Sequence, residues 1–310
     1  MQPLLRKIPL LQLLILAAAI PLFHYWTIRL PDRAEVGARA SEIVYTPVSL
    51  ASEGFAPLRL AGAWKLVSED PRWGGISALA VDGGDLLALT DSGVLARFPK
   101  PPATRATARI RELPDGPGDP RFKRNRDAEA LTRDPAGRGW WVAFENRNEL
   151  WLYDDGFSRP LGRIAFGRGR WPVNRGIEAL APGDQGLVAF AEKGREWIRV
   201  TGTRIETFPL ATRYGYISEA ARAPDRRLFL VARKMALAGI AKRLLVAEGD
   251  AASLHLRSVA RLELGALDNV EAMAAERLTT GQLRLWLMTD NDFQRRRRTL
   301  LVALDVPPAL

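Results

Sequence analysis

The chain has 310 residues, of which 47% are hydrophobic and 26% charged, a composition typical of a globular protein. It has no cysteine, which excludes disulfide bonds, thiolate metal sites and cysteine nucleophiles. A two-histidine zinc site is also excluded from the folded part, because His24 lies in an N-terminal apolar stretch and leaves His255 alone. The formal net charge of +10 favours acidic partners such as phosphate esters, anionic lipid or nucleic acid.

The N-terminus, residues 1–30, is predicted to be a signal anchor or a signal peptide. Arg6 and Lys7 precede an apolar run, and a helix over residues 8–28 would be about 31 Å long, close to the thickness of a bilayer core. The positive flank places the rest of the chain outside the cytoplasm. The alternative is a cleavable signal ending near residues 17–19. An uncleaved anchor is favoured because the apolar run continues past that point.

Both interpretations export the domain. The expected location is the cell envelope, with the domain in the periplasm and either anchored in the inner membrane through residues 8–28 or secreted. Residues 31–54 contain proline, serine and charged side chains and are expected to form a linker. Residues 55–310 are expected to form the folded domain.

This domain contains five related segments. Each has a short alternating run, a turn rich in Asp, Gly or Pro, and a second, more apolar run that ends at a polar residue. The segments begin with GGISALA at 74, RDAEALT at 126, RGIEALA at 175, YISEAAR at 216 and DNVEAMA at 268. A repeat of this length indicates a repeat architecture rather than a chance similarity.

Further strand-like pieces follow each pair of runs, among them ELWLYD, KRLLVAEGD and TLLVALDV. Four short strands in each repeat are typical of a β-propeller blade. The sequence therefore predicts an all-β protein with one propeller of five blades, or of six if one blade has diverged. Residues 58–68 precede the first repeat and are predicted to pair with the C-terminal strand, which closes the ring. The alternative is a large sandwich or barrel with accidental similarity.

The first strand of each blade lines the channel of a propeller, so equivalent positions in the repeats should meet there. The aligned positions are Ala78, Glu129, Glu178, Glu219 and Glu271. Carboxylates gathered in a narrow channel repel one another at low dielectric and need neutralisation. A cation held by oxygen ligands, Ca²⁺ above all, would supply it. Two alternatives are bonds from backbone N–H groups and a salt-bridge network with arginines. The candidate arginines are Arg126, Arg175 and Arg233.

The ends of the second strands should meet near one mouth of the channel. These positions are Asp91, Glu145, Glu192, Lys193, Arg233, Lys234, Asp290, Asn291 and Asp292. The acids could hold a cation, while Lys193, Arg233 and Lys234 are the candidate residues for binding an anionic substrate. The alternative is that they are ordinary solvated turn residues. No catalytic residue is assigned. The run of arginines at 295–298 is expected to be a solvated turn, which in an anchored protein could touch anionic headgroups, and no nucleic-acid partner is expected.

The repeated segments, together with the terminal TDNDF at 289–293, resemble the phytase-like family described as "esterase-like activity of phytase". The resemblance covers roughly residues 60–308 and implies an exported bacterial propeller with calcium-dependent phosphoester or ester hydrolysis. It also implies that Glu129, Glu178, Glu219 and Glu271 are inner-ring acids. The first repeat departs from the pattern, since Ala78 replaces the glutamate.

Two functions follow from these observations. One is a metal-assisted, calcium-type hydrolase of phosphoesters or carboxyl esters, exported and membrane-anchored, whose substrate is a small anionic ester. The other is a non-catalytic envelope propeller that binds a protein or an anionic ligand, in which the channel glutamates are structural. The protein is expected to be a monomer in both cases.

Overall fold

The computed structural model describes most of the chain from residue 38 onward. The described residues are 38–102, 104–167, 170–171, 175–192, 194–236, 239–249, 253–265, 269–291, 293, 297–308 and 310. The predicted signal or anchor segment therefore lies outside the described residues. Within the described part of the chain, no helix is long and apolar enough to cross a membrane.

The described residues are organised almost entirely in strands. The strands are β1 (Arg39–Pro47), β2 (Arg59–Val67), β3 (Ile76–Asp82), β4 (Asp85–Thr90), β5 (Val94–Pro99), β6 (Arg105–Glu112), β7 (Ala128–Arg133), β8 (Trp140–Phe144), β9 (Glu149–Tyr153), β10 (Pro160–Ala165), β11 (Ile177–Pro182), β12 (Leu187–Ala191), β13 (Glu196–Thr201), β14 (Arg204–Pro209), β15 (Tyr216–Arg222), β16 (Leu228–Ala236), β17 (Gly239–Gly249), β18 (Leu254–Arg261), β19 (Asn269–Arg277), β20 (Leu283–Asp290) and β21 (Leu300–Val306). The helical turns are η1 (Ser52–Phe55), α2 (Lys123–Arg126) and η2 (Glu145–Arg147).

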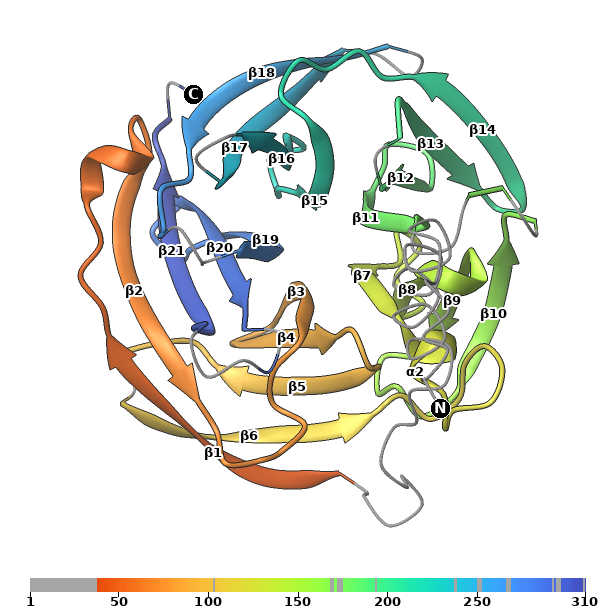
Figure 1. Cartoon of the computed structure of the whole chain (residues 1–310), viewed down its shortest axis with the longest axis horizontal. Coiled ribbons are helices and arrows are strands. Elements are labelled where there is room, and N and C mark those ends of the chain that lie inside the picture. The colour runs from red at the N-terminus through yellow and green to blue at the C-terminus, as the bar shows by residue number, and fades with distance from the viewer. Residues whose placement is uncertain are drawn as a thin grey trace, which may run out of the picture.

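The sheets surround a common centre (Figure 1). In the described residues, β7–β10, β11–β14 and β15–β18 form three separate four-stranded sheets, each with its strands in chain order. A nine-stranded sheet contains two further four-stranded runs, β3–β6 and β19-β20-β21-β2, which β1 joins at their outer edges. The innermost strands contact one another in the cyclic order β3, β7, β11, β15, β19 and back to β3. The predicted all-β propeller is therefore confirmed.

The two ends of the described chain meet in the nine-stranded sheet. Strand β2 pairs antiparallel with β21, with Ala63 opposite Val302, so the predicted pairing of residues 58–68 with the C-terminal strand is confirmed. Strand β1 extends the seam, because it pairs with both β2 and β6. It lies in the stretch expected to be a linker. It forms a strand because its alternating residues Ile43 and Tyr45 are buried against the sheet.

The core lies between neighbouring sheets. Trp140 and Trp151 pack with Leu87 and Leu89 of β4, and Trp286 packs with residues of both β2 and β3. The second strand of each sheet is covered on both of its faces by the neighbouring sheets. In β8 and β12 every residue is therefore buried. The apolar character of the second run in each repeat follows from this position.

Candidate functional site

All five innermost strands, β3, β7, β11, β15 and β19, have a β-bulge near the start of the strand. In each strand the pairing with the second strand skips one residue. The skipped residues are Ser77, Glu129, Glu178, Ser218 and Glu271. A bulge leaves its extra residue outside the ladder and redirects its side chain. The recurrence of the bulge defines the equivalent positions in the ring, which we call the bulge ring.

This register corrects the sequence alignment by one residue in the first and fourth repeats. Ser77, not Ala78, is equivalent to Glu129, and Ser218, not Glu219, is equivalent to Glu178. Both serine hydroxyls donate to backbone carbonyls: Ser77 Oγ lies 2.6 Å from the carbonyl oxygen of Ala128 and 3.3 Å from that of Leu89, and Ser218 Oγ lies 3.4 Å from that of Val231. In the fourth repeat the alignment failed because it matched Glu219 with Glu178, whereas the bulge fixes the true register.

Glu219 consequently lies one position beyond the bulge ring. It is 6% exposed and accepts a hydrogen bond from the backbone N–H of Met273 in β19. Burial, followed by the charge of Glu271, raises the pKa of Glu219 well above its ordinary value. Its carboxyl group is thus packed against the neighbouring inner strand. For Glu219, the alternative in which a backbone N–H group binds the carboxylate is the one that the structure supports.

The second strands place another set of equivalent residues beside the bulge ring. Each of them comes directly after the second-strand residue that pairs with the inner strand just before the bulge, as Asp91 comes after Thr90. These are the strand ends that the sequence predicted. These residues are Asp91, Glu145, Glu192, Arg233 and Asp290. Four are acids and one is an arginine, so the set is mostly anionic.

Arg233 neutralises one side of the channel. Its Nη2 atom lies 2.9 Å from Oε2 of Glu178, and its Nη1 atom donates to Oε1 of Glu271. The guanidinium also lies over the ring of Tyr216, 5.2 Å from the centroid. Burial disfavours the charge on Arg233, but Glu271 and Glu178 outweigh burial and raise its pKa. Two of the predicted ring glutamates are therefore ion-paired with one of the predicted arginines.

The other two candidate arginines lie elsewhere. Arg126 is 2% exposed; burial lowers its pKa, and the largest charges that oppose this effect are those of Tyr153 and Asp115 rather than those of the ring glutamates. Arg175 is exposed to solvent. Of the predicted substrate-binding residues, Arg233 lies in the channel between two carboxylates and Lys234 is exposed beside it, while Lys193 lies outside the described residues. Their role in binding an anion stays a prediction.

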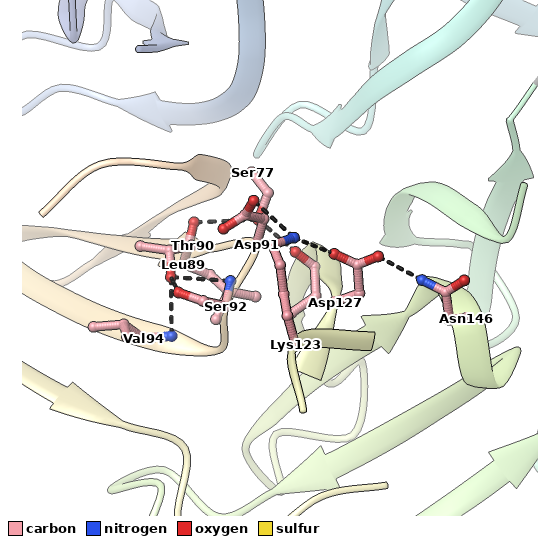
Figure 2. A network of polar contacts seen from close by, with 10 residues as sticks. Ser77, Leu89, Thr90, Asp91, Ser92, Val94, Lys123, Asp127 and Asn146 are labelled. Carbon is pink, nitrogen blue, oxygen red and sulfur yellow. Dashed lines mark hydrogen bonds and ion pairs between the residues drawn. The ribbon is translucent and has the colours of Figure 1, made fainter. Parts of the chain in front are cut away.

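Lys123 in α2 provides a second cation that the sequence analysis missed. Its Nζ atom lies 2.6 Å from Asp127 and 2.9 Å from Asp91, between the first two sheets (Figure 2). Burial opposes its charge, but Asp127 and Asp91 outweigh burial and raise the pKa of Lys123. Asn146 donates to the other oxygen of Asp127. The signal was present in the sequence, because Lys123 precedes Asp127 by four residues, the spacing of a helical ion pair.

Between these two cations lie two overlapping groups of acids. In the first, Asp127, Glu129 and Glu145 each place one carboxylate oxygen within 4.8 Å of the others, and in the second Glu145, Glu178 and Glu192 do the same. Glu145 belongs to both groups. Burial, then the charges of Asp127, Glu178 and Glu192, raises the pKa of Glu145 to about 8. Burial and the charges of Asp127, Glu145 and Glu178 raise that of Glu129 as well.

These two groups can act as oxygen donors for a hard cation. They contain carboxylates only, the ligand type that suits Ca²⁺, Mg²⁺ or Mn²⁺. A cation would also remove the repulsion that raises the pKa of Glu145. Glu129 and Glu178 from the predicted ring belong to these groups, whereas Glu271 and Glu219 do not. Glu145 and Glu192 belong to the second-strand acids that the sequence suggested for holding a cation, whereas Asp127 was not predicted as a metal ligand.

The family model described as "Phytase-like: Esterase-like activity of phytase" matches residues 71–293. The chain belongs to this phytase-like family. The match spans all five bulged inner strands, and the resemblance seen in the repeats is confirmed. No curated protein matches the chain.

Several solved structures are similar to this phytase-like chain at low identity. The virginiamycin B lyase of Staphylococcus aureus, solved in a catalytically inactive form with quinupristin, is 10% identical with a TM-score of 0.46, covering 86% of this chain and 100% of that chain. A selenomethionine-substituted form of that lyase is 10% identical with a TM-score of 0.41. The match covers 70% of this chain and 66% of the lyase chain, just under two thirds of its length. The β-propeller domain of Myceliophteria thermophila Cps50 (Swd1) is 11% identical with a TM-score of 0.44, covering 86% and 100%.

Proposed function

We propose that the phytase-like domain is a hydrolase of phosphoesters or carboxyl esters that works with divalent cations, Ca²⁺ above all, bound at the centre of the channel. The observation that carries this proposal is Glu145, which belongs to both acid groups. Carboxylates this close and this buried are costly unless protons or cations neutralise them. Membership of the phytase-like family supports the same chemistry.

The shared position of Glu145 supports a centre with two cations. Asp127 and Glu129 would hold one cation, Glu178 and Glu192 the other, and Glu145 would bridge them. The sequence-based assignment of Glu129 and Glu178 as metal ligands is retained in this proposal. Glu271 is ion-paired with Arg233 and Glu219 accepts a backbone hydrogen bond, so both would support the centre from outside.

The chain's own residues would position the substrate and handle its protons. Bound cations would lower the pKa of a water molecule and polarise an ester oxygen. A carboxylate of the acid groups that holds no cation would accept the proton of an attacking water. Lys193, Arg233 and Lys234 would attract and orient an anionic ester from the same side.

We also propose that the ring consists of five blades. Five four-stranded units and five equivalent bulges support this number. In this arrangement β1 is an additional outer strand that joins the first and last blades.

A non-catalytic propeller is the second candidate, and Arg233 is the observation that favours it. By pairing with Glu178 and Glu271, it neutralises part of the ring without any metal. In that case the channel acids would be structural, and the domain would bind a protein or an anionic ligand in the envelope.

We further propose the envelope as the location, on the basis of residues 8–28 in the sequence. A reporter enzyme fused after Leu310 should be active only outside the cytoplasm, and the full-length chain should remain in membrane fractions. A soluble product beginning near Ile20 would instead support a cleavable signal.

The hydrolase proposal is tested on the purified protein with metal analysis, thermal melts and a panel of phosphoesters and carboxyl esters. Ca²⁺ at about 100 times its Kd should stabilise the folded state by about 2.7 kcal/mol. Glu145→Gln should remove that stabilisation and any hydrolysis together. The control is Glu42→Gln, whose side chain is 56% exposed in a surface ion pair and should change neither. Ca²⁺-dependent stability without hydrolysis would favour the binding function, and no metal effect at all would favour the structural role.

A further inference from the structure

The β16–β17 hairpin extends beyond the channel mouth. Arg233 marks the level at which the second strands of the other sheets end, and β16 continues for three more residues to Ala236. Beyond Arg233, the register pairs Lys234 with Ala241 and Met235 with Ile240. At about 3.3 Å per residue the hairpin therefore extends about 10 Å past this level.

The described part of the extension carries exposed apolar side chains. Met235 is 71% exposed and Ile240 is 39% exposed, and they face each other across the hairpin. They are two of the few large apolar side chains that the described residues leave exposed. Exposed apolar side chains that lie together, unlike single scattered ones, mark a surface that can contact a membrane or a partner.

A basic groove adjoins this apolar pair, because Ile240 is one of its lining residues. It has a volume of about 790 Å³, within the range of small-molecule sites. Ile240 lines it, as do the ends of β17 and β18, the segment before η1 and the turn before β21. Its charged residues among those described are Lys242, Arg243, Arg261, Arg298 and Glu263. The exposed Lys234 lies on the same hairpin, so the surroundings of the apolar pair are mainly cationic.

We propose that this hairpin and groove dock the domain onto an anionic lipid surface. Met235 and Ile240 would enter the boundary between headgroups and acyl chains, and the groove would hold a lipid phosphate. An apolar end beside several cations is the arrangement of interfacial membrane-binding elements. A protein partner fits less well, because two side chains on a narrow hairpin cannot supply the roughly 800 Å² per partner of a standard interface. This proposal does not depend on hydrolysis.

The test uses the absence of native cysteine. Met235→Cys in the full-length chain introduces a single thiol, which is labelled with an environment-sensitive fluorophore and mixed with vesicles. Leu161→Cys is the matched control, since Leu161 is 42% exposed but lies on the outer strand of another sheet. Because the signal is local to the label, it reports on the hairpin whether or not residues 8–28 insert into the bilayer.

We expect the label at 235 to brighten at least about twofold with vesicles of phosphatidylglycerol and phosphatidylcholine, and to be quenched by a lipid-borne quencher. The label at 161 should not respond. Arg261 is exposed, so its substitution should not disturb the fold. In the labelled Met235→Cys protein, adding Arg261→Gln should lower the ratio of inserted to free hairpin about fivefold. The proposal would be overturned by unchanged fluorescence of the label at 235, by an equal response of the label at 161, or by an equal response to vesicles of phosphatidylcholine alone. A label at 235 that responds only to another protein would overturn it as well.

Discussion

Arg233 Nη2 and Glu178 Oε2 lie 2.9 Å apart and connect the second strand of one sheet with the first strand of the preceding sheet. Glu178 also belongs to the acid group that contains Glu145 and Glu192. It therefore lies at the border between the side of the channel that Arg233 neutralises and the acid group of Glu145 and Glu192. One substitution at this residue tests both roles.

Glu178→Gln should lower the free energy of unfolding by about 2 kcal/mol in the absence of divalent cations. The reason is that Arg233, whose side chain is 8% exposed, keeps Glu271 but loses its second carboxylate. Urea unfolding in EDTA measures this difference. A double-mutant cycle with Arg233→Met isolates the coupling of the pair, which should lie between about 0.5 and 3 kcal/mol. If Glu178 and Arg233 show no coupling energy and Glu178→Gln also removes the stabilisation by Ca²⁺, then Glu178 acts as a cation ligand and not as a partner of Arg233.

The stability of the cation-free domain should fall as the pH rises from about 5 to 8. The folded-state pKa of Glu145 is about 8, above its ordinary value of 4.5, so the folded state holds a proton that the unfolded state has lost. The stability from this group is complete below the unfolded pKa and is lost as the pH rises through the folded one. The slope should be about 1.4 kcal/mol per pH unit for one such group.

Urea unfolding at several pH values measures that slope. Glu145→Gln should reduce the slope by the share of this one group, and saturating Ca²⁺ should also reduce it, because cation binding requires the deprotonated carboxylate. Glu129 and Glu219, whose pKa values are also raised, act in the same direction. A stability that stays constant between pH 5 and 8 would contradict the protonation of these carboxyl groups.

Lys123→Met should destabilise the domain by about 3 kcal/mol at neutral pH, because it leaves Asp91 and Asp127 facing each other without the ammonium group. Ca²⁺ should restore part of this loss, since a divalent cation can occupy the space between two carboxylates. The matched control is Lys100→Met, which removes a similarly buried partner from the single carboxylate Glu276. Thermal melts with and without Ca²⁺ compare the two. Equal recovery in both variants would argue against a specific cation position beside Asp127.

Deleting residues 39–67 should abolish cooperative unfolding of the whole domain. The deletion removes β1 and β2 and exposes the edge of β21, which is buried along its whole length. An exposed apolar edge strand also favours aggregation. Size-exclusion chromatography and a thermal melt measure the effect. A monomer with an unchanged melting temperature would show that the seam contributes nothing to stability.

The repeats made the architecture predictable from the sequence. Each strand pair carries its own turn residues and apolar run, so the sheets follow from local patterns. The ring position of Glu219 could not be predicted in the same way, because YISEAAR offers a glutamate that aligns with Glu178 by identity. Only the pairing of Ile217 with Ala232 and of Glu219 with Val231 shows that Ser218 occupies the bulge. The register of a bulge depends on the partner strand, which the repeat itself does not contain.

The candidate site could be predicted where the same residue type recurs at equivalent positions of the repeats. It could not be predicted where different residue types occupy those positions. Glu129, Glu178 and Glu271 share the bulge and were found. Lys123 was not found, because it lies in a short helix between repeats and has no counterpart to align with. From α2, which precedes β7, its ammonium group reaches Asp91 at the end of β4 and Asp127.

The pairing of β2 with β21 also fixes the order of events during synthesis. Arg59 and Asp305, which face each other in this seam, are 246 positions apart, whereas the strands of β7–β10, β11–β14 and β15–β18 are neighbours in the chain. At 5 to 20 residues per second, β2 waits roughly 12 to 50 s for its partner. The sheets in between can form as they emerge, while the strand that completes the last sheet is among the first to be made. Strand β2 is therefore synthesised before the rest of the ring and buried after it.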